Sequence, residues 1–209
     1  MQVKRALISV SDRRGVGAFA RALTKEFHIE VIATSGTAAA LQRENVSAVE
    51  ISHFTGANDT LNGLVKTLHQ DVYMGILCRR DQHPDSELIA AKIVRPIDLV
   101  VVNLYPFRET VAKPNVTLQE AIENIDIGGP TMIRAAAKNY AWVAVVIDPQ
   151  DYTAVLDDMA AHDGSVSEAL RKRLAVKAFR HTALYDAAID TYLSGQLAGE
   201  VVRHTFCIE

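Results

Sequence analysis

Two loops rich in hydroxyl groups have the residue types that hold a phosphate group. Each loop follows an apolar run of strand length, at residues 6–10 and 29–33. The loops read Ser9-Val10-Ser11-Asp12-Arg13-Arg14-Gly15 and Thr34-Ser35-Gly36-Thr37. Free N–H groups at a helix start, assisted by hydroxyl and guanidinium groups, bind small phosphates. The same residue types are also preferred as simple helix caps, so the loops alone leave both interpretations open.

A third candidate segment lies within residues 96–139. Asn103 and Tyr105 end an apolar run there, and Asp126 precedes a Gly-Gly-Pro sequence that leads into a helical pattern. Paired glycines allow a ligand to approach the backbone closely, and proline suits the first turn of a helix. In a parallel sheet such strand ends face the ligand. The alternative is a strand end and a glycine-rich helix start without chemistry.

Composition and motifs argue against several other classes of ligand. The formal net charge of −3 disfavours a large nucleic-acid interface. Neither GxGxxG nor GxxxxGK[ST] occurs, so dinucleotide and ATP sites lose their usual support, and no His, Cys and carboxylate group has metal-ligand spacing. The two cysteines are too few for a disulfide framework, and the N-terminal stretch MQVKRALISVSD has no small-residue cleavage site. The apolar runs are far shorter than a membrane span. We therefore expect a cytoplasmic chain without membrane contact.

The elements that must position these loops alternate between strand and helix patterns up to about residue 150. Continuous apolar strands separated by helices predict a three-layer, Rossmann-like α/β fold with a parallel sheet covered on both faces. The expected strands are 6–10, 29–33, 46–51, 74–78, 99–104 and 142–147. We expect an α/β core over 1–150, a helical extension packed on it over 151–195, and a tail over 196–209.

Motifs along residues 5–193 identify a family. They are, in chain order, ISVSD, SGTA, VKTLH, GIL-RR, NLYPF, TVAKP-V, EAIENIDIGGPT, RAAAKN and KAF-HTA-YDAAI. The chain closely resembles the inosine monophosphate (IMP) cyclohydrolase domain of the bifunctional purine-biosynthesis enzyme. The resemblance implies a methylglyoxal-synthase-like fold, a homodimer, and a purine ribotide substrate handled without cofactor or metal. The implied reaction is dehydrative ring closure of 5-formamidoimidazole-4-carboxamide ribotide to IMP. Formyl transfer by the enzyme's transformylase domain, which these motifs do not cover, is not expected.

The resemblance also implies the site residues. The catalytic group would be Lys66, Tyr105, Asp126 and Lys138. Residues at the phosphate and ribose end would be Ser11, Asp12, Arg13, Arg14, Thr34, Ser35, Gly36 and Thr37. Residues around the base would be Thr67, Asn103, Ile127 and Gly128. We expect Asp126 to orient or deprotonate the carboxamide. Lys66 and Tyr105 are expected to stabilise the developing oxyanion and the departing oxygen. Lys138 is expected to keep Asp126 ionised or to share its role.

The segment from Leu64 to Met74 departs from the family pattern. Leu64 replaces an arginine, Gln70 a proline and Tyr73 a histidine. A lost charge-assisted contact weakens binding roughly ten- to a hundredfold, so a weakened or re-tuned cyclohydrolase is expected. The alternatives are a non-catalytic purine-nucleotide-binding module of the same fold and, less well supported, a methylglyoxal-synthase-type lyase.

Overall fold

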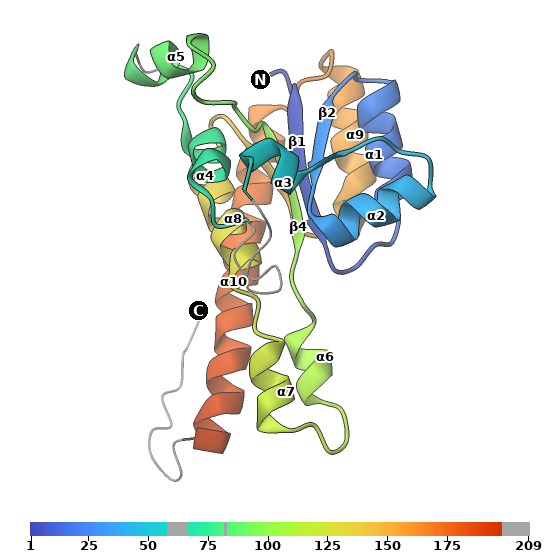
Figure 1. Ribbon diagram of the computed structural model, residues 1–209, viewed down its shortest axis with the longest axis vertical. Helices are drawn as coiled ribbons and strands as arrows, with labels where there is room; N and C mark the ends of the chain where they lie inside the picture. The colour runs from blue at the N-terminus through green and yellow to red at the C-terminus, as the bar shows by residue number, and fades with distance from the viewer. Residues whose placement is uncertain (58–66, 82, 198–209) are drawn as a thin grey trace.

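A computed structural model describes residues 1–57, 67–81 and 83–197 of the chain (Figure 1). In these residues five parallel strands form one sheet in the order β3-β2-β1-β4-β5. The strands are β1 (Arg5–Val10), β2 (Glu30–Ala33), β3 (Val49–Glu50), β4 (Leu99–Asn103) and β5 (Ala144–Val146). Helices cover both faces of the sheet, which confirms the predicted α/β fold class.

The helices follow the strands in the alternation expected of a parallel sheet. In chain order they are α1 (Val16–Lys25), α2 (Ser35–Arg43), α3 (Ile51–Thr55), α4 (Gln70–Leu77), α5 (His83–Ala90), α6 (Phe107–Val111), α7 (Leu118–Glu123), α8 (Gly128–Lys138), α9 (Tyr152–Ala161) and α10 (Glu168–Leu197), with a 3₁₀ turn η2 at Pro149–Asp151. In the part of the chain that the structure describes, no helix has both the length and the apolar character that crossing a bilayer requires.

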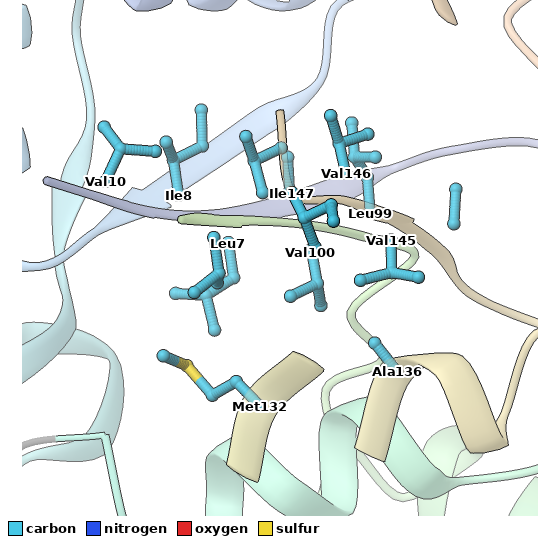
Figure 2. Packing of buried hydrophobic residues seen from close by; sticks show 14 of the residues in the cluster. Leu7, Ile8, Val10, Leu99, Val100, Met132, Ala136, Val145, Val146 and Ile147 are labelled. Carbon is cyan, nitrogen blue, oxygen red and sulfur yellow. The ribbon is translucent and has the colours of Figure 1, made fainter. Parts of the chain in front are cut away.

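The central strands are buried on both faces, which explains their continuous apolar runs. Figure 2 shows Leu7, Val100 and Val145 on the face toward Met132 and Ala136 of α8. Ile8, Val10 and Val146 point to the opposite face, where α1, α2 and α9 lie (Figures 1 and 2). This alternation follows from the two-residue period of a strand. The sheet is therefore fixed between two apolar layers, and its loops at the strand ends remain free for a ligand.

The last two helices pack on the sheet layers. The ring of Tyr152 on α9 stacks on Phe19 of α1 with the centroids 4.3 Å apart. Helix α10 lies against α8 and β5, and its second half continues beyond the sheet beside α6 and α7 (Figure 1). Its buried side chains include Leu170, Leu174, Ala178 and Tyr185, which form one apolar stripe along the helix. The stripe therefore faces the protein as its three- and four-residue spacing indicates.

One predicted strand is wrong. Residues 74–78 lie mainly in helix α4, which buries Val72, Gly75 and Ile76. The apolar run was too short to distinguish a strand from a buried helix. Gly75 allows α4 to approach the chain that leads into β4: its carbonyl accepts the N–H of Ile97 at 2.9 Å, and a Cβ there would lie 2.6 Å from the carbonyl oxygen of Arg95.

We expect Gly75→Ala to lower the free energy of unfolding by about 1–3 kcal/mol, because the added methyl group meets fixed backbone. The matched control is Gly195→Ala on α10, where a Cβ would have no atom within 4 Å. There alanine should be neutral or stabilise by up to about 1 kcal/mol. Urea unfolding followed by circular dichroism measures both changes. Equal stabilities of the two variants would contradict the close approach at Gly75.

Candidate active site

A cavity of ≈ 240 Å³ lies where β1, β2 and β4 end and α8 begins. It is lined by Ser9, Val10, Ser11, Arg13, Thr34, Gly36, Thr37, Thr67, Asn103, Tyr105, Ile125, Asp126, Ile127, Gly128, Gly129 and Met132. This is the sheet edge at which parallel α/β proteins bind ligands. The cavity joins the two hydroxyl-rich loops to the glycine-rich start of α8, so the three segments suggested by sequence meet in one place.

The two threonines at the start of α2 are buried, and their hydroxyl groups bind the neighbouring strand. Thr37 is 2% exposed, and its Oγ1 accepts the N–H of Val10 at 3.1 Å. Thr34 is 5% exposed, and its hydroxyl donates to Ser9 Oγ at 3.1 Å. These bonds tie the end of β1 to the first turn of α2. They fix the loop geometry before any ligand enters, which lowers the entropic cost of binding.

Asn103 at the end of β4 holds the loop after β1. Its Oδ1 accepts the N–H groups of Ser11 and Asp12 at 2.7 and 2.8 Å, and its Nδ2 donates to the carbonyl oxygen of Asp12 at 2.9 Å. The side chain was expected to line the base. It does line the cavity, but these three bonds use its amide to shape the loop.

Arginines of the first loop point in different directions. Arg13 lines the cavity, and its Nη2 lies 3.2 Å from the point where a Cβ on Gly36 would stand. Arg14 instead forms an ion pair with Asp12 at 2.5 Å, and this hydrogen-bonded guanidinium lowers the pKa of the Asp12 carboxyl group. Asp12 and Arg14 line a different cavity. Arg13 is thus the guanidinium group available to an anion in the main cavity.

Asp126 lies in the turn that leads into α8. Its Oδ1 accepts the N–H of Gly129 at 2.8 Å, and its own N–H donates to the Tyr185 hydroxyl at 2.9 Å. Gly129 is required here, because a Cβ would lie 2.5 Å from Asp126 Oδ2 and 2.6 Å from Leu104 Cδ2. The carboxylate therefore lies at the N-terminus of α8. Tyr105, 46% exposed, reaches the same cavity from the end of β4.

Four other residues of the predicted site do not line this cavity. Asp12, Arg14 and Ser35 are absent from its wall. Lys138 is exposed at the opposite end of α8, and the ten residues that separate it from Gly128 span about 15 Å of helix. The expected contact between Lys138 and Asp126 is therefore not formed within this chain. Lys66 and Leu64 lie outside the described residues, so their predicted parts stay predictions.

Several lining residues were not among the predicted site residues. Ser9, Val10, Ile125, Gly129 and Met132 also face the cavity. Most are neighbours of predicted residues, and the alternation of a strand would have indicated that Ser9 shares a face with Ser11. Met132 carried no such signal. Nowhere in the described residues are three or more His, Cys, Asp or Glu side chains grouped so that they could hold a metal ion.

Two of the residues that depart from the family pattern lie on α4. Gln70 is the first residue of that helix, and the ring of Tyr73 packs partly buried against the core. Burial raises the pKa of Tyr73 to about 12. The phenol therefore remains neutral across the physiological pH range, whereas a histidine at this position would be able to titrate near neutrality.

A parallel sheet with a hydroxyl-lined cavity at its carboxyl edge is typical of α/β proteins that bind small phosphorylated molecules. Residues 15–131 match the family model of the MGS-like domain, and the chain belongs to this family. Residues 136–208 match the model of the AICARFT/IMPCHase bienzyme. Over 90% of this chain and 97% of the other, the fold also matches the crystal structure of ForH, at 34% identity and a TM-score of 0.79.

Curated relatives agree with these models. The chain is 52% identical over 207 residues to the bifunctional purine biosynthesis protein PurH of Listeria monocytogenes serovar 1/2a, and 51% identical over 205 residues to that of Acidithiobacillus ferrooxidans. Each alignment covers 98% of this chain, but only 40% and 39% of the relatives' own lengths. The family resemblance indicated by the motifs is confirmed.

The buried hydroxyl at Thr37 gives a test of the site's construction. We expect Thr37→Val to lower the free energy of unfolding by about 1–3 kcal/mol, because the N–H of Val10 loses its acceptor. The control is Thr24→Val on α1, whose hydroxyl donates only to carbonyl groups of its own helix; it should change stability by less than about 0.5 kcal/mol. Urea denaturation measures both. A Thr37→Val variant as stable as the control would refute the described bond.

Proposed function

We propose that this chain is an IMP cyclohydrolase, which closes the ring of 5-formamidoimidazole-4-carboxamide ribotide to form IMP and water. The observation that carries the proposal is a single cavity that combines a hydroxyl-rich loop pair with Tyr105 and Asp126. Its support is the resemblance to PurH over nearly the whole chain and to the AICARFT/IMPCHase bienzyme model. The hydroxyl, guanidinium and carboxylate groups of the cavity wall support a polar, phosphorylated ligand.

The ring closure needs proton transfers and a group that stabilises charge on oxygen. The carboxamide nitrogen attacks the formyl carbon and gives up one proton, while the formyl oxygen takes a proton and becomes a hydroxyl group. The formamido nitrogen then loses its proton and forms the C=N bond, and the hydroxyl leaves with a proton as water. An amide nitrogen is a poor nucleophile, so orientation and general-base assistance accelerate its attack.

The described residues suit these steps. Asp126 would orient the carboxamide and accept its proton, and the Tyr105 hydroxyl would donate to the formyl oxygen. The free N–H groups at the start of α8 would favour negative charge nearby. The phosphate would lie against Arg13, Ser11 and the first turn of α2. By family resemblance, Lys66 is proposed to stabilise charge on the formyl oxygen together with Tyr105.

The proposal extends to the organisation of the protein. We infer a homodimer in the cytoplasm that uses no cofactor. Three side chains on α10, Val176, Phe179 and Leu184, are between 40% and 63% exposed, and such an apolar surface supports pairing of two copies. We also propose a division into an α/β core over 1–150, a helical extension over 151–195 and a tail over 196–209.

Mixing the pure protein with the formamido ribotide should produce IMP above the spontaneous rate, followed by absorbance. Asp126→Asn should lower kcat by about 10²–10³, because the carboxylate base is lost in a side chain of the same size. Asp157→Asn, an exposed position on α9, is the control and should keep wild-type turnover. Tight IMP binding without turnover in the folded wild type would favour the binding module, and methylglyoxal formed from dihydroxyacetone phosphate would favour the lyase.

The phosphate end of the site predicts a distinct effect of Arg13. Replacing it with alanine should weaken IMP binding by about ten- to a hundredfold, since a charge-assisted contact is lost. Binding of inosine, which lacks the phosphate, should not change. Arg43→Ala, on the exposed last turn of α2, should affect neither ligand. Titration calorimetry measures the affinities of both ligands for the wild type and for the two variants. Equal losses for IMP and inosine would place Arg13 away from the phosphate.

A further inference from the structure

Tyr185 of α10 reaches the turn that carries Asp126. Its side chain is buried, at 8% exposure, although α10 belongs to the helical part of the chain that follows the sheet. The hydroxyl accepts the N–H of Asp126 at 2.9 Å and donates to the carbonyl oxygen of Asn124 at 3.3 Å. One phenol group thus binds the turn on both sides of Ile125, so it fixes the path of the backbone into α8.

The ring of Tyr185 contacts the segment that carries Tyr105. It meets Phe107 edge-on, with centroids 6.3 Å apart, and the N–H of Phe107 donates to the Tyr105 carbonyl oxygen at 2.8 Å. Arg108, the next residue, donates from Nη2 to the carbonyl oxygen of Leu184 at 3.1 Å. Helix α10 therefore contacts both segments that supply proposed acid–base groups, and Tyr185 touches both of them directly.

The phenol must stay neutral to make its two bonds, because only an O–H group can accept and donate at once. Burial raises the pKa of Tyr185, which keeps the hydroxyl protonated well above neutral pH. The Asp126 carboxylate is held from the other side by the N–H of Gly129 at 2.8 Å. With its backbone bound to Tyr185 and its carboxylate bound to Gly129, Asp126 is fixed at both ends.

We propose that Tyr185 is a positioning residue for the ring closure, acting through Asp126 by the hydrogen bond to its backbone N–H. The inference rests on the proposed function and adds a group from α10 that does not itself touch the substrate. Misplacement of a reacting group by about 1 Å costs up to about a hundredfold in rate. Loss of the hydroxyl should therefore lower turnover, while the phosphate loops remain as they are.

The test compares Tyr185→Phe with Tyr192→Phe. Tyr192 lies two turns further along α10 and its ring also meets Phe107 edge-on, at 5.8 Å. Within the described part of the chain its hydroxyl makes no hydrogen bond, so it is a matched control. We expect Tyr185→Phe to lower kcat by about 10- to 100-fold with KM changed less than about twofold. Tyr192→Phe should retain wild-type kcat and KM.

Two further measurements separate positioning from general loss of structure. Amide hydrogen exchange at Asp126 should be faster in Tyr185→Phe and unchanged in Tyr192→Phe. In a double-mutant cycle, Tyr185→Phe added to Asp126→Asn should cause no further loss of kcat, because its effect passes through the carboxylate.

The outcomes separate the two claims. Normal kcat in Tyr185→Phe beside an active wild type would overturn the positioning role and leave the proposed function intact. Additive losses in the cycle would also overturn it, since they would show a general structural effect. A folded wild type without turnover would overturn the proposed function, and the catalytic role of Tyr185 with it.

Discussion

The site depends on the parallel pairing of β1 with β4. Val10 pairs with Asn103 at the carboxyl ends of these strands, so the loop after one strand starts beside the last side chain of the other. A shift of one residue would turn the Asn103 side chain to the opposite face. In the observed register its amide reaches Ser11 and Asp12, and the chain can then cross from the sheet into α1. Gly15, with φ of +69°, makes the turn that completes this crossing.

Most polar groups around the cavity are held by the protein itself. Thr37 binds the end of β1, Asn103 binds the loop after it, and Asp126 binds the start of α8. Each bond spans segments that are distant in sequence or closes a helix terminus. Such prior ordering lowers the entropic cost of binding, because the groups need not be arranged when a ligand arrives. Arg13 is the contrasting case, since its exposed guanidinium lines the cavity without a hydrogen bond to another group of the described residues.

Much of the fold follows from the sequence because buried parallel strands have continuous apolar runs. β1, β2, β4 and β5 were predicted within a few residues. The strand prediction at 74–78 failed because a closely packed helix produces the same short apolar pattern as a buried strand. What distinguishes the helix is the contact of Gly75 with the chain at Arg95. Local pattern could not supply that contact, which joins residues twenty positions apart.

The site was predicted less completely, for a related reason. Residue type indicated which side chains could bind a phosphate or transfer a proton. Most of the residues taken from the motifs line the cavity at the carboxyl edge of the sheet. Type did not indicate direction: Arg13 and Arg14 are neighbours, yet Arg14 turns outward to Asp12. Residue type also did not indicate how far a side chain lies from the cavity. Lys138 is on the same helix as Gly128 but at its opposite end.

Helix α10 shows how a segment outside the sheet can be part of the site. Its 30 residues extend for about 45 Å, far more than is needed to cover β5. The second half lies beside α6 and α7 (Figure 1), and there Arg108 and Phe107 bind it while Tyr185 binds the turn before α8. A sheet edge alone provides strand ends and helix starts, whose loops are the least constrained parts of a fold. By contacting two of those loops at once, α10 restrains both of them, as the proposed acid–base chemistry at a fixed distance would require.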